Sequence, residues 1–222
     1  MLSGTGLVAG YRKQIAVLDG VDVEVPRGTV TGLAGPSGCG KSTLARVLAL
    51  LQRPWSGQVT VDGAEATGFR HATSRAQRAA IGVVFQQPRP AVDPRFTLRQ
   101  VVAEPLHATG RTGEAPTRVG ELAEQVGLTG ELLDRRPHEV SDGQLQRACL
   151  ARALALRPRY LICDEMTAML DASTTAALVR VVGERVAEDG TGVLAISHDE
   201  ALLERWAATT LRLGDMTAAG PM

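Results

Sequence analysis

The stretch "GLAGPSGCGKSTLARVLALL", residues 32–51, determines the fold expected for this chain. Gly35 is followed, after four residues, by the triplet "GKS" at 40–42, which is the spacing of a phosphate-binding loop, or P-loop. The loop follows an apolar run and leads into a helix with an apolar stripe, the context in which P-loops occur. A glycine-rich turn with a surface lysine is the alternative, and it leaves this context unexplained. The stretch therefore predicts an α/β protein that binds a nucleoside triphosphate.

Each residue type in the loop has a chemical reason. Glycine has no Cβ atom, so the backbone can curl and point its N–H groups at phosphate oxygens. Lys41 would bring a cation to the β- and γ-phosphates, and the Ser42 hydroxyl would be a ligand of Mg²⁺. The positive N-terminal end of the following helix also favours a bound anion. The residues predicted to bind the nucleotide here are Gly35, Pro36, Ser37, Gly38, Cys39, Gly40, Lys41, Ser42 and Thr43.

Apolar runs elsewhere in the chain predict a mostly parallel sheet. They show little alternation and lead into turns or helices, as strands buried on both faces do. They are "TVTGLAG" (29–35), "IGVVFQ" (81–86), "RYLICDE" (159–165) and "GVLAISHD" (192–199). In contrast, valines alternate with polar residues in "GVDVEVPRG" (20–28) and "SGQVTVDG" (56–63), which favours antiparallel strands with one solvated face.

Helical periodicity fills the middle of the chain. In "TLRQVVAEPLHAT" (97–109) and "RVGELAEQVGL" (118–128), apolar residues recur at three- and four-residue spacing. We therefore expect a single domain over residues 1–222. Residues 1–87 and 158–222 would form an α/β core with the antiparallel strands at its N-terminal end, and residues 88–157 would form an inserted helical lobe.

Two acidic residues end the third apolar run. Asp164 and Glu165 follow "YLIC" directly, and the carboxyl end of a strand parallel to the P-loop strand is where such proteins hold Mg²⁺. Asp164 would hold the ion, directly or through water, and Glu165 would orient and deprotonate the attacking water. His198, at the end of the fourth run, is a candidate to bond the γ-phosphate or this carboxylate. The alternatives without a functional role are a solvated turn for Asp164 and Glu165, and a helix-capping or turn position for His198.

The composition narrows the classes of function. Lys plus Arg and Asp plus Glu both number 24, so the chain lacks the basic excess that a general nucleic-acid binder needs. No apolar run approaches the ~20 residues that cross a bilayer, and the first residues do not follow the pattern of a signal peptide. Cys39, Cys149 and Cys163 lack metal-ligand spacing, so we expect free thiols in a reducing compartment. These features favour a cytoplasmic chain.

In this order and spacing, the motifs resemble those of the ATP-binding subunits of ABC transporters over nearly the whole chain. The matching segments are "GPSGCGKST" (35–43, Walker A), "VVFQQP" (83–88, Q-loop), "VSDGQLQR" (140–147, signature), "YLICDE" (160–165, Walker B), "AMLD" (168–171, D-loop) and the switch histidine His198. The resemblance implies an ABC-type P-loop NTPase fold, with a RecA-like parallel core, an antiparallel β subdomain and an inserted helical subdomain. It also implies ATP and Mg²⁺ as cofactors, and ATP hydrolysis coupled to transport.

The resemblance also implies roles for particular residues. Tyr11 would stack on adenine, Gln86 would sense Mg²⁺ and take part in catalysis, and Asp171 would be the D-loop residue. Each ATP would lie between the Walker A motif of one subunit and the signature of the other, which is here Ser141, Asp142, Gly143 and Gln144. The implied partners are a second ATPase chain, identical or different, the transmembrane permease and an extracytoplasmic solute-binding protein. The chain would then lie at the cytoplasmic face of the membrane.

Finer similarities point to one group of these ATPases. "FQQPRPAVDPRFTLRQVVAEPL" (85–106) and "RRPHEVSDGQLQRACLARALALRPRYLI" (135–162) are similar to segments of the peptide, opine and nickel importers. A soluble ABC ATPase without a transport role is an alternative, although the long inserts and basic arms of such proteins are missing. An exporter is another, because the permease sets the direction of transport. A P-loop kinase would leave the signature and the switch histidine unexplained.

The signature departs from the usual Ser-Gly-Gly-Gln at Asp142. Ser141 and Gln144 have the spacing of a capping box, and such a cap stabilises a helix by about 0.5–2 kcal/mol, so a helix start alone explains the stretch. A carboxylate ~6 Å from one phosphate charge, at an effective dielectric constant of about 20, is repelled by roughly 3 kcal/mol. If the signature contacts ATP, we therefore expect the Asp142 carboxylate to point away from it, leaving Ser141 and the Gly143 N–H to make the contact.

We predict that Lys41→Ala abolishes nucleotide binding, because it removes the cation that faces the β- and γ-phosphates. Titration of the purified variant with a fluorescent ATP analogue would measure this. An unchanged affinity would contradict the assignment of the P-loop.

Overall fold

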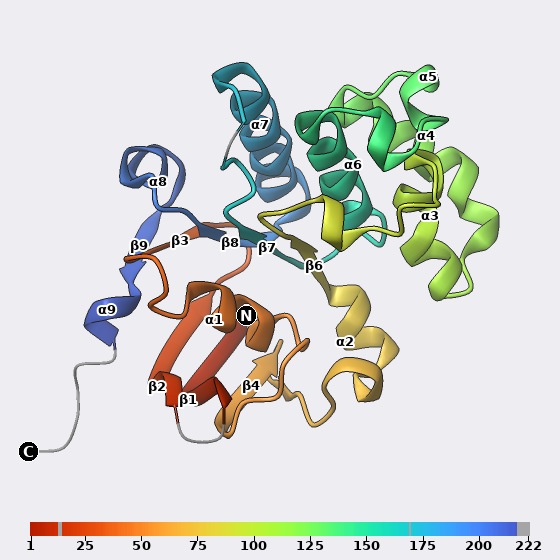
Figure 1. Cartoon of the computed structure of the whole chain (residues 1–222). Helices are drawn as coiled ribbons and strands as arrows, with labels where there is room; N and C mark the ends of the chain where they lie inside the picture. The colour runs from red at the N-terminus through yellow and green to blue at the C-terminus, as the bar shows by residue number, and fades with distance from the viewer. Residues whose placement is uncertain (13–14, 169, 217–222) are drawn as a thin grey trace, which may run out of the picture.

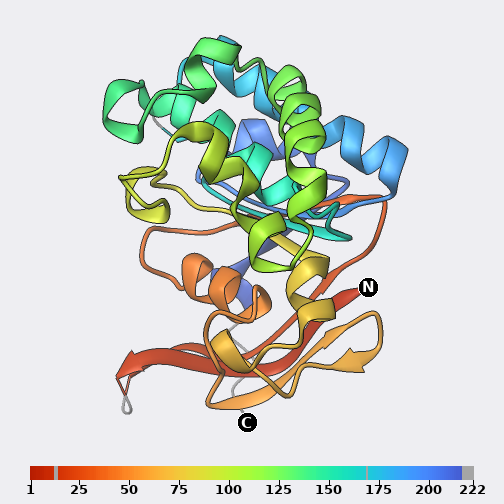
Figure 2. The same ribbon diagram turned by 90° about the vertical axis from the view of Figure 1, so that its right-hand side faces the viewer.

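The computed structural model describes residues 1–12, 15–168 and 170–216 (Figure 1). The end of the expected core, residues 217–222, and Met169 of the expected D-loop lie outside the described residues. Two sheets and a set of helices are stacked in layers, with the helical lobe on one side of the central sheet and the antiparallel strands on the other (Figure 2).

The central sheet is parallel, as the apolar runs predicted. Its strand order is β6-β7-β8-β3-β9, and each neighbouring pair is parallel. The strands are β6 (Ile81–Val84), β7 (Tyr160–Asp164), β8 (Gly192–Ile196), β3 (Val30–Ala34) and β9 (Thr209–Arg212). Every residue of β3, β7 and β8 is buried, because helices or strands cover both faces of these strands. The edge strand β9 is partly polar and mostly exposed, and the apolar runs did not predict it.

The second sheet is antiparallel, in the order β2-β1-β4-β5. Its strands are β1 (Leu2–Arg12), β2 (Ile15–Val25), β4 (Ser56–Val61) and β5 (Ala64–Glu65). In β2 the buried residues Val21, Val23 and Val25 alternate with exposed ones, which confirms one solvated and one covered face.

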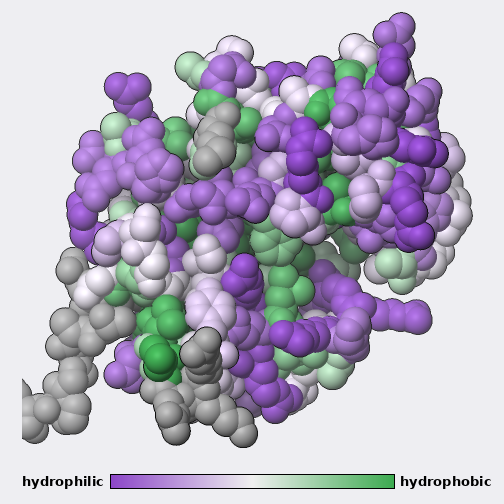
Figure 3. Space-filling view, in the orientation of Figure 1, coloured by the Kyte–Doolittle hydropathy of each residue, from purple (hydrophilic) through white to green (hydrophobic). Residues whose placement is uncertain are grey.

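The helices surround the central sheet on both sides. They are α1 (Lys41–Leu48), α2 (Arg75–Ala80), α3 (Leu98–Ala108), α4 (Ala115–Val126), α5 (Gly130–Leu133), α6 (Asp142–Leu154), α7 (Ala172–Asp189), α8 (Glu200–Trp206) and α9 (Leu213–Met216). Short 3-10 turns lie at Arg70–Ala72, Arg89–Ala91, Thr112–Glu114 and Pro137–Glu139. Among the described residues, no helix has the length and apolar character needed to cross a membrane. The face of the molecule seen in Figure 1 is largely hydrophilic, with hydrophobic residues in a strip near its centre (Figure 3).

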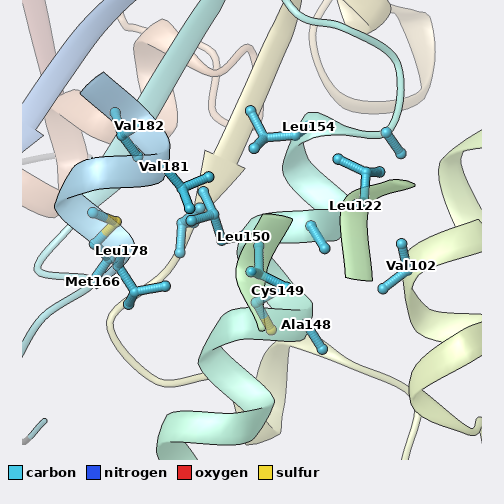
Figure 4. Close-up of a cluster of buried hydrophobic side chains, with 14 of the residues drawn as sticks. Val102, Leu122, Ala148, Cys149, Leu150, Leu154, Met166, Leu178, Val181 and Val182 are labelled. Carbon is cyan, nitrogen blue, oxygen red and sulfur yellow. The ribbon is translucent and has the colours of Figure 1, made fainter. Parts of the chain in front are cut away.

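Alternate residues of the buried strands contact two separate hydrophobic cores. Leu161 and Cys163 of β7 belong to the core formed with α3, α4, α6 and α7, whereas Tyr160 and Ile162 belong to the core formed with α1 and the antiparallel sheet. Figure 4 shows the first core, with Leu150 of α6 directed toward the side chains on α7. Helix α6 therefore joins the lobe to the central sheet. The three cysteines are free thiols, as expected, and only Cys39 is partly exposed.

We predict that Gly82→Ala destabilises the chain by about 1–3 kcal/mol, as overpacking of a filled site does. A Cβ atom at Gly82 in β6 would lie 2.5 Å from the Ala153 carbonyl oxygen of α6, and backbone cannot give way as a side chain can. Gly120→Ala on the exposed face of α4 is the matched control, since a Cβ atom there meets nothing within 4 Å. That change should instead stabilise the helix by about 0.5–1 kcal/mol. Urea unfolding of both variants would measure the difference, and equal effects would contradict this packing.

Candidate nucleotide-binding and hydrolysis site

The P-loop lies at the carboxyl end of β3 and leads directly into α1. Its glycines need a left-handed backbone, with φ of 149° at Gly35, 83° at Gly38 and 111° at Gly40. A Cβ atom at Gly40 would also lie 2.9 Å from Cγ1 and 3.1 Å from the carbonyl oxygen of Val17 in β2. Glycine is therefore required at this position by both backbone conformation and close packing.

Lys41 is a buried cation inside this loop. Its side chain is only 6% exposed, and its Nζ donates hydrogen bonds to the carbonyl oxygens of Gly35 (2.7 Å) and Pro36 (2.9 Å). None of the ion pairs found within the described ranges gives it a carboxylate partner. A buried charge without a counter-ion is costly, and an anionic ligand in the loop would supply that counter-ion. This arrangement fits the phosphates of a nucleotide.

Asp164 at the end of β7 faces the start of α1. Its Oδ1 accepts a hydrogen bond of 3.2 Å from the Ser42 hydroxyl, and its side chain is almost fully buried. Burial raises the pKa of this carboxyl, the Ser42 hydrogen bond lowers it, and the neighbouring charge of Glu165 raises it. A carboxylate and a hydroxyl are oxygen donors of the kind that Mg²⁺ prefers, so the two side chains fit that ion.

Side chains from the ends of three parallel strands meet at Glu165. Gln86, after β6, donates a hydrogen bond of 2.8 Å from Nε2 to Oε2 of Glu165. Nδ1 of His198, after β8, lies 3.7 Å from the same oxygen. Glu165 itself has φ of 49°, which is uncommon for a residue with a side chain and often marks a functional site. The structure therefore brings the three predicted catalytic residues together.

Arg46 lies beside the same site, and the sequence analysis missed it. It stands on α1, four residues after Ser42, and its charge lowers the pKa of Asp164. It lines an open pocket of about 440 Å³ with Ser42, Gln86 and Asp164. The one-turn spacing from Ser42 on a predicted helix was the available signal.

The structure places Tyr11 beside the P-loop helix. The Tyr11 side chain is 66% exposed, and its hydroxyl accepts hydrogen bonds from Oγ1 of Thr43 (3.0 Å) and from a guanidinium nitrogen of Arg46 (3.3 Å). The two hydrogen bonds therefore hold the hydroxyl end of the exposed Tyr11 ring next to the P-loop.

The signature and D-loop residues cap two other helices. Ser141 and Gln144 form the capping box of α6. The Asp142 carboxylate forms an ion pair with Arg89. Asp171 caps α7, and hydrogen bonds from Ser173 and then Thr174 hold the pKa of its carboxyl well below the usual range. The structure thus gives these four signature and D-loop side chains no hydrogen bond to the P-loop of their own chain within the described residues.

We predict that Asp164→Asn raises the stability of the nucleotide-free chain by about 0.5–2 kcal/mol near neutral pH. The pKa of Asp164 is higher in the folded chain, so the folded state opposes the charged form, and a neutral amide removes that cost. The gain should shrink as the pH falls through the folded pKa, because the native carboxyl is then protonated. Thermal unfolding at several pH values would measure it, with Asp134→Asn as the exposed control. A loss of stability at neutral pH would contradict the burial argument.

Comparisons with known proteins agree with this geometry. A family model described as ABC transporter matches residues 18–168. The nickel import ATP-binding protein NikE of Shigella boydii serotype 4 is 39% identical over 203 residues, which cover 90% of this chain and 76% of that protein. The glutathione import ATP-binding protein GsiA of Pectobacterium atrosepticum is 38% identical over 221 residues, which cover 98% of this chain and 36% of that protein.

The fold is also shared with solved structures. A dimeric post-hydrolysis state of the ATP-binding cassette MJ0796, bound to ADP and Pi, matches with a TM-score of 0.85 and 27% sequence identity. The match covers 96% of this chain and 94% of that chain. These likenesses confirm the expected fold, with its parallel core, antiparallel sheet and helical lobe. The chain therefore belongs to the ABC transporter family and carries its ATPase domain.

Proposed function

We propose that this chain binds and hydrolyses ATP to power the import of a peptide, nickel or a similar small solute through a separate permease. The observation that carries the proposal is the meeting of Gln86, Glu165 and His198 beside a P-loop whose buried lysine donates to two backbone carbonyl oxygens and forms no ion pair within 4 Å among the described residues. The import-type names of the similar proteins, for nickel and for glutathione, support the class of solute.

The loop residues would hold the triphosphate of ATP. Backbone N–H groups of the P-loop and the Lys41 ammonium would face the phosphate oxygens, and the exposed Tyr11 ring would stack on the adenine. Ser42, Asp164 and Gln86 would hold Mg²⁺. Bound there, Mg²⁺ supplies positive charge that offsets the charge of the phosphates.

Glu165 would act as the general base. Its carboxylate accepts a hydrogen bond from Gln86, which keeps one oxygen in place and leaves the other to take a proton from water. His198 is mostly exposed, while Glu165 is largely buried, so the histidine lies on the open side of the carboxylate. It would orient the attacking water or the γ-phosphate from that side.

A second ATPase chain, identical or different, would complete each site with its signature. Gly143 supports this part of the proposal, because the chain itself does not require glycine there. Its φ is not positive, and a Cβ atom at this position would meet nothing closer than 3.6 Å. Since neither the backbone conformation nor the packing within this chain requires glycine at position 143, the residue is suited to bring its backbone close to a ligand held by another chain. Ser141 would contribute its hydroxyl, and Asp171 would lie at the contact between the two chains.

The helical lobe would meet the permease at the cytoplasmic face of the membrane. The position of β6 at the edge of the sheet supports this, since a mainly apolar groove of about 380 Å³ runs between it and the helices α3 and α6. A solute-binding protein outside the membrane would deliver the solute to the same system. In this proposal residues 88–157 move with the permease, while residues 1–87 and 158–222 hold the nucleotide.

We predict that Glu165→Gln lowers the rate of ATP hydrolysis by about 10²–10⁴-fold and leaves the affinity for ATP unchanged. Glutamine keeps an acceptor for Gln86 but cannot take a proton from water. Phosphate release and equilibrium binding of ATP would be measured on the same preparation. The exposed Glu131→Gln on α5 is the matched control and should hydrolyse ATP normally. Unchanged turnover in Glu165→Gln would contradict the assignment.

The transport role is tested by what the chain binds in the cell. Tagged Glu165→Gln protein would be purified with ATP from detergent-extracted membranes, and its companions identified by mass spectrometry. We expect a polytopic permease, with a sibling ATPase if the pair is mixed. Recovery of soluble partners only would contradict a transport function, although not the ATPase activity.

A further inference from the structure

Arg89 contacts the start of α6, which we call the signature helix, from the loop that follows β6. It stands in the 3-10 turn Arg89–Ala91, three residues after Gln86. Its Nε lies 2.8 Å from Oδ1 of Asp142, and its two terminal nitrogens donate to the carbonyl oxygens of Pro137 (2.7 Å) and Val140 (3.1 Å). All three guanidinium nitrogens are therefore engaged by the segment that leads into the signature.

This geometry differs from that of an ordinary surface ion pair. The Arg89 and Asp142 side chains are 47% and 63% exposed, and such a pair alone contributes little to folding. The two backbone bonds, however, fix the guanidinium in one orientation, so the carboxylate meets a cation that is already in place. The ion pair therefore determines the direction in which the Asp142 carboxylate points.

A second tie joins the same helix to the catalytic residues. Gln146 of α6 is 2% exposed, and its Nε2 donates to the carbonyl oxygens of Phe85 (3.0 Å) and Met166 (3.1 Å). Phe85 precedes Gln86, and Met166 follows Glu165. Arg89, Asp142 and Gln146 line one small pocket of about 220 Å³ together with Gln86. The signature helix is thus attached on both sides of its first turn to the segment that carries Gln86.

We propose that Arg89 is a positioning residue that holds the Asp142 carboxylate away from the ATP of the second subunit. This inference rests on the proposed function, because the signature must face that ATP for the carboxylate to matter. With the carboxylate neutralised by Arg89, the Ser141 hydroxyl and the Gly143 N–H remain available to the phosphates. Without Arg89, the negative charge would be free to turn toward the triphosphate and repel it. The aspartate and the arginine therefore work as a pair, in a signature that lacks the usual glycine.

The first test measures the pair in the full chain without nucleotide, by amide hydrogen exchange of residues 137–146. Arg89→Gln should speed exchange there by about threefold or more, because the tie to Asp142 and the two carbonyls is lost. Asp142→Gly alone and the double variant complete the cycle. If the pair is coupled, Arg89→Gln has a smaller effect in the Asp142→Gly background. Strictly additive effects would overturn the proposal.

The second test uses Glu165→Gln chain with ATP and Mg²⁺ and measures ATP-driven association of subunits by sedimentation. Arg89→Gln should weaken association by about tenfold, since an unpaired carboxylate faces the phosphates. Adding Asp142→Gly, or Asp142→Asn, should restore association to within about twofold of the parent. If Arg89 had a merely structural role, removing the charge of Asp142 would not restore association in the Arg89→Gln variant. Equal weakening with and without Asp142 would overturn the proposal.

A matched ion pair in the same lobe serves as control. Arg99 and Asp134 are 49% and 69% exposed, with nitrogen and oxygen 2.9 Å apart, and the side-chain hydrogen bonds of Arg99 in the described residues go to Asp134 and not to residues 137–146. Arg99→Gln should change neither exchange at 137–146 nor association. Equilibrium binding of ATP to the parent separates the two claims. If the parent does not bind ATP, the proposed function fails, while the exchange cycle still decides whether Arg89 positions Asp142.

Discussion

The parallel register of β3, β6, β7 and β8 is the constraint on which the rest of the structure depends. Because the strands run in one direction, their carboxyl ends meet at one edge of the sheet, and the side chains of the site come from the strand ends and from the start of α1. The P-loop follows β3, and Gln86, Glu165 and His198 follow the other three strands. The hydrogen bonds from Ser42 to Asp164 and from Gln86 to Glu165 depend on this register.

The edge that holds these groups is electrostatically costly. It contains a buried lysine that donates hydrogen bonds to two carbonyl oxygens and a buried carboxyl whose pKa is raised by burial. The proposed triphosphate and Mg²⁺ would offset both charges at once, so binding would lower the free energy of these two buried groups. The same reasoning extends to the proposed role of the signature, where the ATP of a second subunit would lie near the Asp142 carboxylate that pairs with Arg89.

Much of the fold was predictable because local patterns carry it. Apolar runs identified β3, β6, β7 and β8, and alternating valines identified β2. The sequence also led to a conditional prediction, that the Asp142 carboxylate points away from ATP if the signature contacts ATP, and this stays a prediction. It did not predict β9, whose polar sequence at a sheet edge lacks an apolar signal, nor the tie from Arg89 to Asp142. That pair joins residues 53 positions apart (142 minus 89), and only the path of the chain through three dimensions brings them together.

The most direct measurement is a structure of the Glu165→Gln chain with ATP and Mg²⁺. The account predicts the triphosphate in the loop at residues 35–43, with Mg²⁺ at Ser42 and Asp164. It also predicts contacts to the γ-phosphate from Ser141 and Gly143 of a second ATPase subunit, with each Asp142 carboxylate turned to Arg89 of its own chain. A triphosphate held by one subunit alone, or bound away from this loop, would contradict the account.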